Sequence, residues 1–173
     1  IILDNPCLVV PPGGCVHKAT YQTVLNLPYA PAGYTIAYQR CCRNELIRNI
    51  PFPLNTGISF IAEISGKAQL ECNSAATFNQ WPPVAICIHV PINFDHAASD
   101  PDGDSLRYRL CTPLNGPDFA HSVPDPPAGP PYEELNWIDP PFNLQNIMGG
   151  DPLSIDSISG FMTGIPNTLG NFV

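Results

Sequence analysis

Apolar and polar side chains alternate along several short stretches of the chain, which is the pattern of half-buried β-strands. Between residues 34 and 39, large apolar side chains occupy the even positions, and smaller or polar ones occupy the odd positions. Residues 58–64 alternate in the same way, and Gly66 follows them. The alternation predicts one strand over each stretch, and we expect a further strand over 20–27.

The second half of the chain repeats this pattern with longer interruptions. In a strand from residue 84, side chains 84, 86, 88 and 90 would share one face, and the strand would continue through Ile92 and Phe94. Residues 106, 108 and 110 would face inward after an acidic loop. Residues 153–172 read as strand, glycine turn, strand, proline turn and strand, a meander typical of a β-sandwich. A loop or one short helical turn is expected within 45–55, and a helical turn within 143–148.

Proline shapes the rest of the picture, because the 173 residues include 22 prolines and only 13% are charged. Proline disrupts helix interiors and central strands, so the chain should consist of short strands and structured loops. Trp81-Pro82-Pro83 reads as a joint between two modules, residues 1–75 and 76–173. Residues 112–141 form a proline-rich insertion in the second module. Both ends of the chain read as cut from a longer protein, and no signal peptide is visible.

Four carboxylates precede the strand expected at residue 106, and they suggest a cation site. Asp100, Asp102 and Asp104 alternate and can converge, with Asp95 as a further ligand, while Gly103 permits a sharp turn. Calcium accepts such irregular oxygen cages. The spacing is not that of an EF-hand. The alternative interpretation is a solvated turn, because Asp, Pro and Gly are turn residues.

Charge divides the chain unevenly and bears on its partners. Residues 1–94 contain four acidic and five basic side chains, whereas residues 95–173 contain eleven and two, within a net charge of −8. This acidic half disfavours nucleic acid and anionic membranes, which attract Lys- and Arg-rich surfaces. The chain lacks the run of about 18 apolar residues that membrane insertion requires.

Seven cysteines and no C-x-x-C pair indicate an oxidising compartment and argue against a zinc ribbon. Cys7 and Cys15 flank a Pro-Pro-Gly-Gly turn and are predicted to form a disulfide. Cys41 and Cys42 would point to opposite faces of a strand and so have different partners. Two expected neighbouring strands would allow a bridge between residues 87 and 111. The remaining thiol, at Cys72, lies in a polar connector, and an odd count leaves one cysteine without an internal partner.

Two motifs resemble known repeats. Residues 98–108 (ASDPDGDSLRY) resemble the opening of cadherin-like and Ig-like repeats in bacterial surface proteins, and residues 155–172 are similar to their closing half. Residues 38–44 (YQRCCRN), followed by the acidic block, resemble gliding-motility-associated surface adhesins of Bacteroidetes. The resemblance implies an all-β fold of tandem Ig-like/cadherin-like β-sandwich domains with long Pro-rich loops. It also implies a secreted or cell-surface location and Ca²⁺ at Asp100, Asp102 and Asp104. The cysteine content and the 112–141 insertion depart from simple repeats.

The same resemblance raises O-glycosylation at Asp-Ser/Thr-apolar triplets. The triplets at 104–106 and 156–158 fit this pattern, and Ser157 is the better candidate because Ser105 would compete with metal ligation. A chance triplet in a turn remains the alternative.

Catalytic motifs are weak in this sequence. The adjacent acids Glu133 and Glu134 do not have the separation that a glycosidase needs, and no nucleophile elbow or phosphate loop occurs. Tyr132 and Trp137 could stack on sugar rings, although local packing under long loops is the alternative.

We therefore expect a non-catalytic structural or adhesive module of a large secreted surface protein, stabilised by Ca²⁺ and disulfides. Its partners would be neighbouring domains of the same chain, identical subunits or a surface polysaccharide. The alternatives are a subunit of an extracellular fibre, a carbohydrate-binding accessory module of an exported enzyme and, least favoured, a hydrolase.

Overall fold

The computed structural model describes residue 7 and residues 19–173. The described chain is rich in β-structure, and its strands form small sheets, all of them antiparallel. One sheet pairs β1 with β2, a second pairs β3 with β5, and the third has the order β4-β7-β6. The strands are β1 (Tyr34–Arg40), β2 (Ile58–Ile64), β3 (Thr77–Phe78), β4 (Ile92–Asp95), β5 (Ala98–Ser99), β6 (Asp151–Ile155) and β7 (Phe161–Ile165).

Three short helical segments connect these strands: α1 (Gly66–Glu71), η1 (Pro53–Asn55) and η2 (Phe119–His121). The hydroxyl of Ser65 accepts a hydrogen bond from the amide of Ala68 and caps the N-terminus of α1. No helix within the described residues has the length and apolarity to cross a bilayer.

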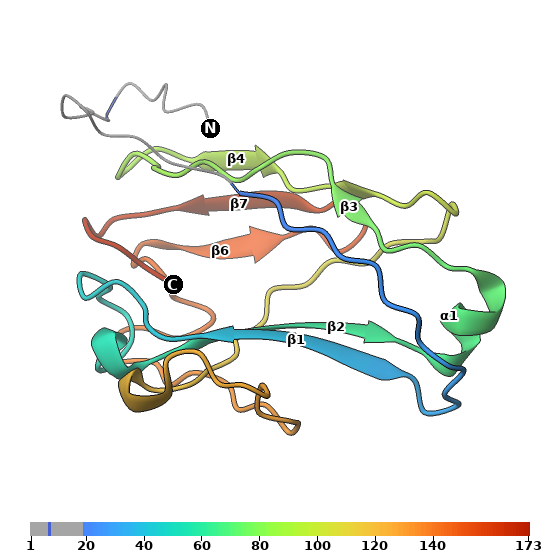
Figure 1. Ribbon diagram of the computed structural model, residues 1–173. Helices are drawn as coiled ribbons and strands as arrows, with labels where there is room; N and C mark the ends of the chain where they lie inside the picture. The colour runs from blue at the N-terminus through green and yellow to red at the C-terminus, as the bar shows by residue number, and fades with distance from the viewer. Residues whose placement is uncertain (1–6, 8–18) are drawn as a thin grey trace.

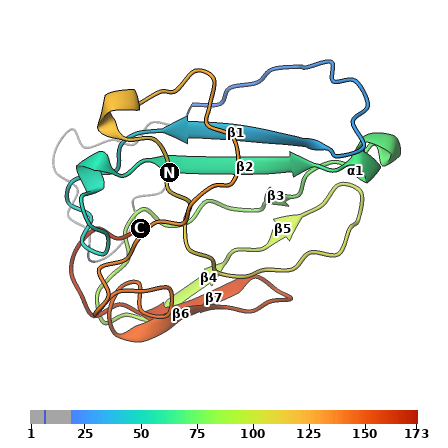
Figure 2. The same ribbon diagram turned by 90° about the horizontal axis from the view of Figure 1, so that it is seen from below.

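The β1–β2 sheet and the three-stranded sheet lie on different sides of the molecule in both ribbon views (Figures 1 and 2). The insertion packs beside β1 and β2, on the side away from the three-stranded sheet (Figure 1). Helix α1 lies at the end of the molecule where β2 ends (Figure 1).

The two faces of the β1–β2 sheet have different environments. Gln39 and Ser59 are directly opposite each other and buried, and the Gln39 side-chain amide donates to the Ser59 hydroxyl at 3.1 Å. On the other face, Tyr38 and Phe60 stack with their ring centroids 6.5 Å apart, yet they are 57% and 63% exposed. The insertion covers the polar pair and leaves the aromatic pair open.

The most deeply buried described side chains are Ile50 and Asn49. The Asn49 side chain donates to the carbonyls of Ile147 and Val173 and accepts from the amide of Val173. Its backbone carbonyl accepts from the amide of Ile138 at 3.0 Å. This one residue therefore joins three segments that lie far apart in the sequence.

Contacts of this kind cross the predicted module boundary at residue 75. Ile47 forms a parallel bridge with Asn171, and Cys7 is disulfide-bonded to Cys87. The division into 1–75 and 76–173 stays a prediction, but these contacts join its two described parts.

Four predicted strands are confirmed, as β1, β2, β6 and β7, and the strand predicted from residue 84 forms only in its last part, as β4. The rest is wrong: residues 20–27, 84–90, 106–110 and 170–172 form no strand, apart from a single bridge at Asn171. Prolines at 82, 83 and 91 flank the second of these segments, and proline cannot donate to a ladder. Its residues 84, 86, 88 and 90 are exposed rather than inward-facing. Residues 106, 108 and 110 are more buried than Arg107 and Arg109, so the side chains alternate there although no strand pairing forms.

The helical turn expected within 143–148 is absent, whereas the 3-10 helix η1 lies within 45–55, where a loop or a helical turn was expected.

The disulfide predictions need correction. Cys7 pairs with Cys87, with their Cα atoms 5.6 Å apart, so the Cys7–Cys15 and Cys87–Cys111 predictions are wrong. Cys15 itself lies outside the described residues. Cys111 and Cys72 are exposed free thiols. The Cys87–Cys111 prediction assumed two neighbouring strands, and neither forms.

Cys41 and Cys42 are disulfide-bonded to each other, which contradicts the prediction of different partners. That prediction assumed that both residues lie on a strand with alternating side chains. Strand β1 ends at Arg40, so the alternation does not extend to them.

We expect Cys87→Ser to lower the free energy of unfolding by about 2–5 kcal/mol, because it opens a loop closed over a sequence separation of 80. Cys111→Ser and Cys72→Ser are matched controls and should change it by less than about 0.5 kcal/mol, since both thiols are exposed. Urea unfolding measures the change, and mapping of non-reduced peptides should recover a Cys7–Cys87 cross-link. A recovered Cys7–Cys15 peptide would contradict the connectivity.

Candidate functional site: a groove beneath the proline-rich insertion

A buried arginine attaches the insertion to the β1–β2 sheet. Arg43, only 8% exposed, donates from Nε to the carbonyl of Gly57 and from Nη2 to the carbonyl of Leu114, both at 3.1 Å. Burial lowers the pKa of its guanidinium from the ordinary value. An arginine remains charged nonetheless, and the two charge-assisted bonds to carbonyls give partners to its Nε and Nη2 donors.

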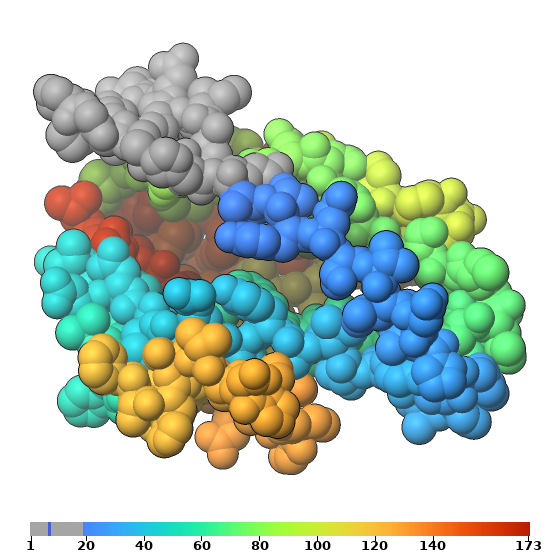
Figure 3. Space-filling model, viewed as in Figure 1, coloured from blue at the N-terminus to red at the C-terminus, as the bar shows by residue number. Residues whose placement is uncertain are grey.

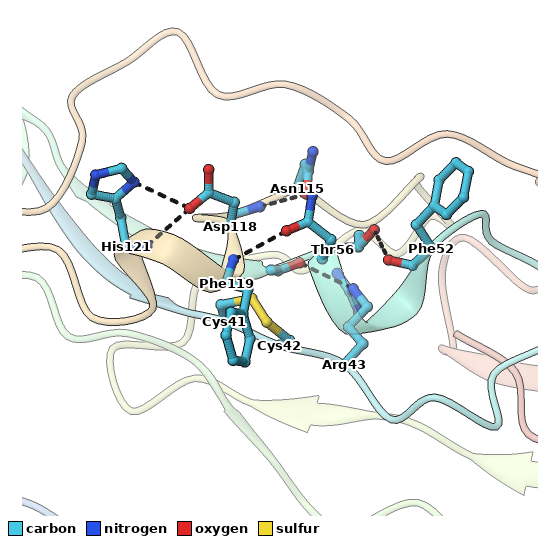
Figure 4. Close-up of a disulfide and its surroundings, with 12 residues drawn as sticks. Cys41, Cys42, Arg43, Phe52, Thr56, Asn115, Asp118, Phe119 and His121 are labelled. Carbon is cyan, nitrogen blue, oxygen red and sulfur yellow. Dashed lines mark hydrogen bonds and ion pairs between the residues drawn. A yellow bond between two sulfur atoms is a disulfide. The ribbon is translucent and has the colours of Figure 1, made fainter.

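Further hydrogen bonds hold the insertion along its length. The amide of Ala128 donates to Gln39 Oε1 at 2.7 Å, and the amide of Phe119 donates to Asn55 Oδ1 at 3.3 Å. The amide of Cys41 donates to the carbonyl of Ser122, which places the Cys41–Cys42 disulfide next to the end of η2 (Figure 4). The insertion is thus bonded to the segments between β1 and β2 at both ends of η2, and to β1 itself at residue 128.

Glycines allow close backbone contact at the start of the insertion. A Cβ atom at Gly116 would collide with the backbone of Ile58, and one at Gly57 would collide with the carbonyl oxygen of Pro117. The space-filling view shows the insertion, in orange, packed directly against the light-blue residues of β1 and the loop after it (Figure 3).

Between the insertion and the polar face of the sheet lies an open groove with a volume of about 400 Å³. Its lining combines amide, hydroxyl, carboxylate and imidazole groups with one aromatic ring and several prolines. The lining residues that bear on its chemistry are Gln39, Ser59, Asn115, Asp118, His121, Tyr132 and Glu133.

Asp118 and His121 form a local pair at the groove. Asp118 is the N-cap of η2, and its carboxylate accepts from the His121 backbone amide at 2.9 Å. The His121 ring Nδ1 lies 3.2 Å from the same oxygen (Figure 4). The backbone hydrogen bond from His121, followed by its side-chain bond, lowers the pKa of Asp118 below its ordinary value. Asp118 is therefore a carboxylate at neutral pH.

The two aromatic residues that the sequence indicated have different surroundings. Tyr132 lines the groove and is half-buried. Trp137 does not line it, and its indole Nε1 is buried away from any hydrogen-bond acceptor. Of the two aromatic residues that the sequence indicated, Tyr132 therefore lies in the groove. Trp137 instead fits the alternative of local packing under a long loop.

The acidic loop does not bring its carboxylates together. Asp100 Oδ1 accepts from the amides of Asp102 and Asp104, at 2.9 and 3.2 Å, and closes an Asx-type turn. Asp102 Oδ2 instead accepts from the amide of Ser74, and Asp95 Oδ1 accepts from that of Ala97. In the part of the chain that the structure describes, no three His, Cys, Asp or Glu side chains are placed to share a metal ion. These residues do not fit a calcium cage, and the calcium prediction gains no support from them.

Ser157 is exposed in the turn between β6 and β7. Its backbone carbonyl accepts from the amide of Tyr108, and the neighbouring Asp156 carboxylate caps the amides of Ile158 and Ser159. Its accessibility is compatible with modification, and its O-glycosylation stays a prediction.

No protein-family model, curated protein or solved structure matches the chain. The case for a function therefore depends on the residues of this chain alone.

The sequence indicated Tyr132 of the groove, but it did not indicate Gln39, Asn115 or Asp118, and it had set Glu133 aside. An Asp three residues before a His, at the start of a short helix, is too common a capping pattern to predict a site. Only the docking of the insertion on β1 brings these side chains together.

The acidic loop can be tested with paired substitutions. We expect Asp100→Ala to lower the free energy of unfolding by about 1–2 kcal/mol, because two backbone amides lose their acceptor. Asp100→Asn keeps the Oδ1 acceptor and should stay within about 0.5 kcal/mol of the unmodified chain.

Melting with and without EDTA supplies the control for metal binding. The Asx turn needs no ion, so chelation should leave the melting temperature unchanged. A marked drop in melting temperature with EDTA, together with equal damage from Asn and Ala, would show that the loop holds a cation.

Proposed function

We propose that this chain is a non-catalytic adhesive module of a large secreted protein displayed on the cell surface. The proposal includes an Ig-like or cadherin-like β-sandwich as the finer description of the β-rich fold. It also includes attachment to neighbouring domains of the same chain and binding of a surface polysaccharide. Calcium is not part of it.

The observation that carries the proposal is the fixed insertion. A loop segment of 30 residues is uncommon in a compact domain unless it has a function, and scaffold-held loops are where binding residues concentrate. Here Arg43, Gln39 and Asn55 each bond to the insertion from the sheet or from the loop beside it. The loop is therefore presented as a defined surface with a groove beneath it.

The cysteines support an extracellular location. Cys7–Cys87 and Cys41–Cys42 are disulfide-bonded, and structural disulfides persist in oxidising compartments. A covalent link between segments about 80 residues apart also suits a protein that resists pulling and proteolysis outside the cell.

A hydrolase is less well supported by the same groove. A glycosidase needs one carboxylic acid with a raised pKa to protonate the leaving group. Asp118 has its pKa lowered by hydrogen bonds from His121, which suits a permanent hydrogen-bond acceptor rather than a proton donor.

The proposal can be tested with beads coated with the oxidised chain and held under laminar flow on cells that produce the parent protein. We expect Arg43→Met to lower the free energy of unfolding by about 2–4 kcal/mol or to release the insertion, because two buried carbonyls lose their donor. Beads carrying this variant should be retained several-fold less than beads carrying the unmodified chain.

Arg40→Met is the matched control, since Arg40 is an exposed arginine three residues earlier. It should change neither stability nor retention appreciably. Antibody labelling of intact cells tests the location directly. Labelling that appears only after the cells are permeabilised, or equal retention of uncoated beads, would contradict the proposal.

A further inference from the structure

We propose that the groove beneath the insertion binds an uncharged carbohydrate chain. In this assignment Tyr132 stacks on one sugar ring. The Asp118 and Glu133 carboxylates accept hydrogen bonds from its hydroxyls, and the Asn115 amide donates to or accepts from them. The inference rests on the proposed adhesive function, whose polysaccharide it specifies as uncharged and to which it adds a binding site.

The size and shape of the groove fit this class of ligand. Its volume of about 400 Å³ lies within the range of about 300–1,000 Å³ in which small-molecule sites fall. It is open along the surface rather than enclosed, which suits a few sugar units of a longer chain.

Its chemistry fits as well. A sugar ring has an apolar face of C–H groups and an edge of hydroxyls, so its site needs a flat aromatic surface beside planar polar groups. Tyr132 supplies the first, and Asn115, Asp118 and Glu133 supply the second, all within one groove.

The polar floor of the groove is rigid, which reduces the entropy lost on binding. Gln39 is held by Ser59 and by the amide of Ala128, and Asp118 is held by His121. These side chains are already ordered before a ligand arrives.

Charge selects against acidic ligands. Asp118 and Glu133 place carboxylates on the lining, and like charges repel. Arg43 is not part of the lining, and its Nε and Nη2 donate to the carbonyls of Gly57 and Leu114 rather than to a ligand. A phosphate, a sulfated sugar or a uronic acid is therefore disfavoured against a neutral sugar.

The chain offers a matched control on the same sheet. Tyr38 is an exposed tyrosine whose ring stacks on Phe60, on the face of β1 opposite Gln39. Tyr38 is an exposed aromatic ring that does not line the groove. Replacing it therefore tests whether any exposed ring binds the polymer non-specifically, as distinct from binding in the groove.

The experiment is native gel electrophoresis of the oxidised chain through gels containing a soluble neutral β-glucan, a mannan or, as the acidic probe, polygalacturonate. Oligosaccharides of the retarding polymer then give a dissociation constant by calorimetry. We expect retardation by a neutral polymer and none by polygalacturonate. Tyr132→Ala should weaken binding about tenfold, the upper range for an aromatic stacking contact, and Tyr38→Ala should leave it unchanged.

Several outcomes would overturn the inference: no retardation by any neutral polymer, retardation by polygalacturonate alone, or a loss of binding with Tyr38→Ala that equals or exceeds the loss with Tyr132→Ala.

If Tyr132→Ala does not fold, the variant Glu133→Gln provides the test instead. It should weaken the discrimination against polygalacturonate while the unfolding midpoint stays unchanged, and unaltered discrimination would count against the groove. Retention of coated beads without binding of neutral polymers would refute the ligand class and leave the adhesive function standing.

Discussion

The hydrogen bonds of the buried Arg43 guanidinium are the interaction on which the candidate site depends. Arg43 follows β1 directly, and its side chain reaches both the turn before β2 and the start of the insertion. A buried charge is costly when its donors lack partners, so the carbonyls of Gly57 and Leu114 stabilise the guanidinium where it is. If the insertion left the sheet, the hydrogen bond from Nη2 to Leu114 would be lost.

A small apolar core makes such polar contacts more important. Few described side chains are fully buried, and one of them is the amide of Asn49, which joins the segments around Ile147 and Val173, while the backbone carbonyl of Asn49 accepts from Ile138. Hydrogen bonds that replace packing in this way are directional, and a buried amide left without partners costs more than the bonds contribute. The Cys7–Cys87 disulfide restricts the unfolded chain in addition.

The acidic loop shows how one local pattern can serve two purposes. Alternating aspartates can form a calcium cage or can accept hydrogen bonds from their own backbone. In this chain Asp100 bonds to the amides of Asp102 and Asp104, and Asp102 turns towards Ser74. The turn is closed by the backbone that carries the carboxylates, so their spacing alone does not require an ion.

The sequence by itself determined local features: the strands β1, β2, β6 and β7, the part of a longer predicted strand that forms β4, and the proline-rich insertion. Alternation and turn residues act over a few positions, so a single sequence reveals them. The tertiary structure decided which segments, distant in the sequence, are neighbours in space. The disulfide partners of Cys7 and Cys41, the burial of Gln39 and the assembly of the groove all depend on contacts between distant segments. Chain-local patterns carry no information about such contacts, because packing and hydrogen bonding across the fold select them.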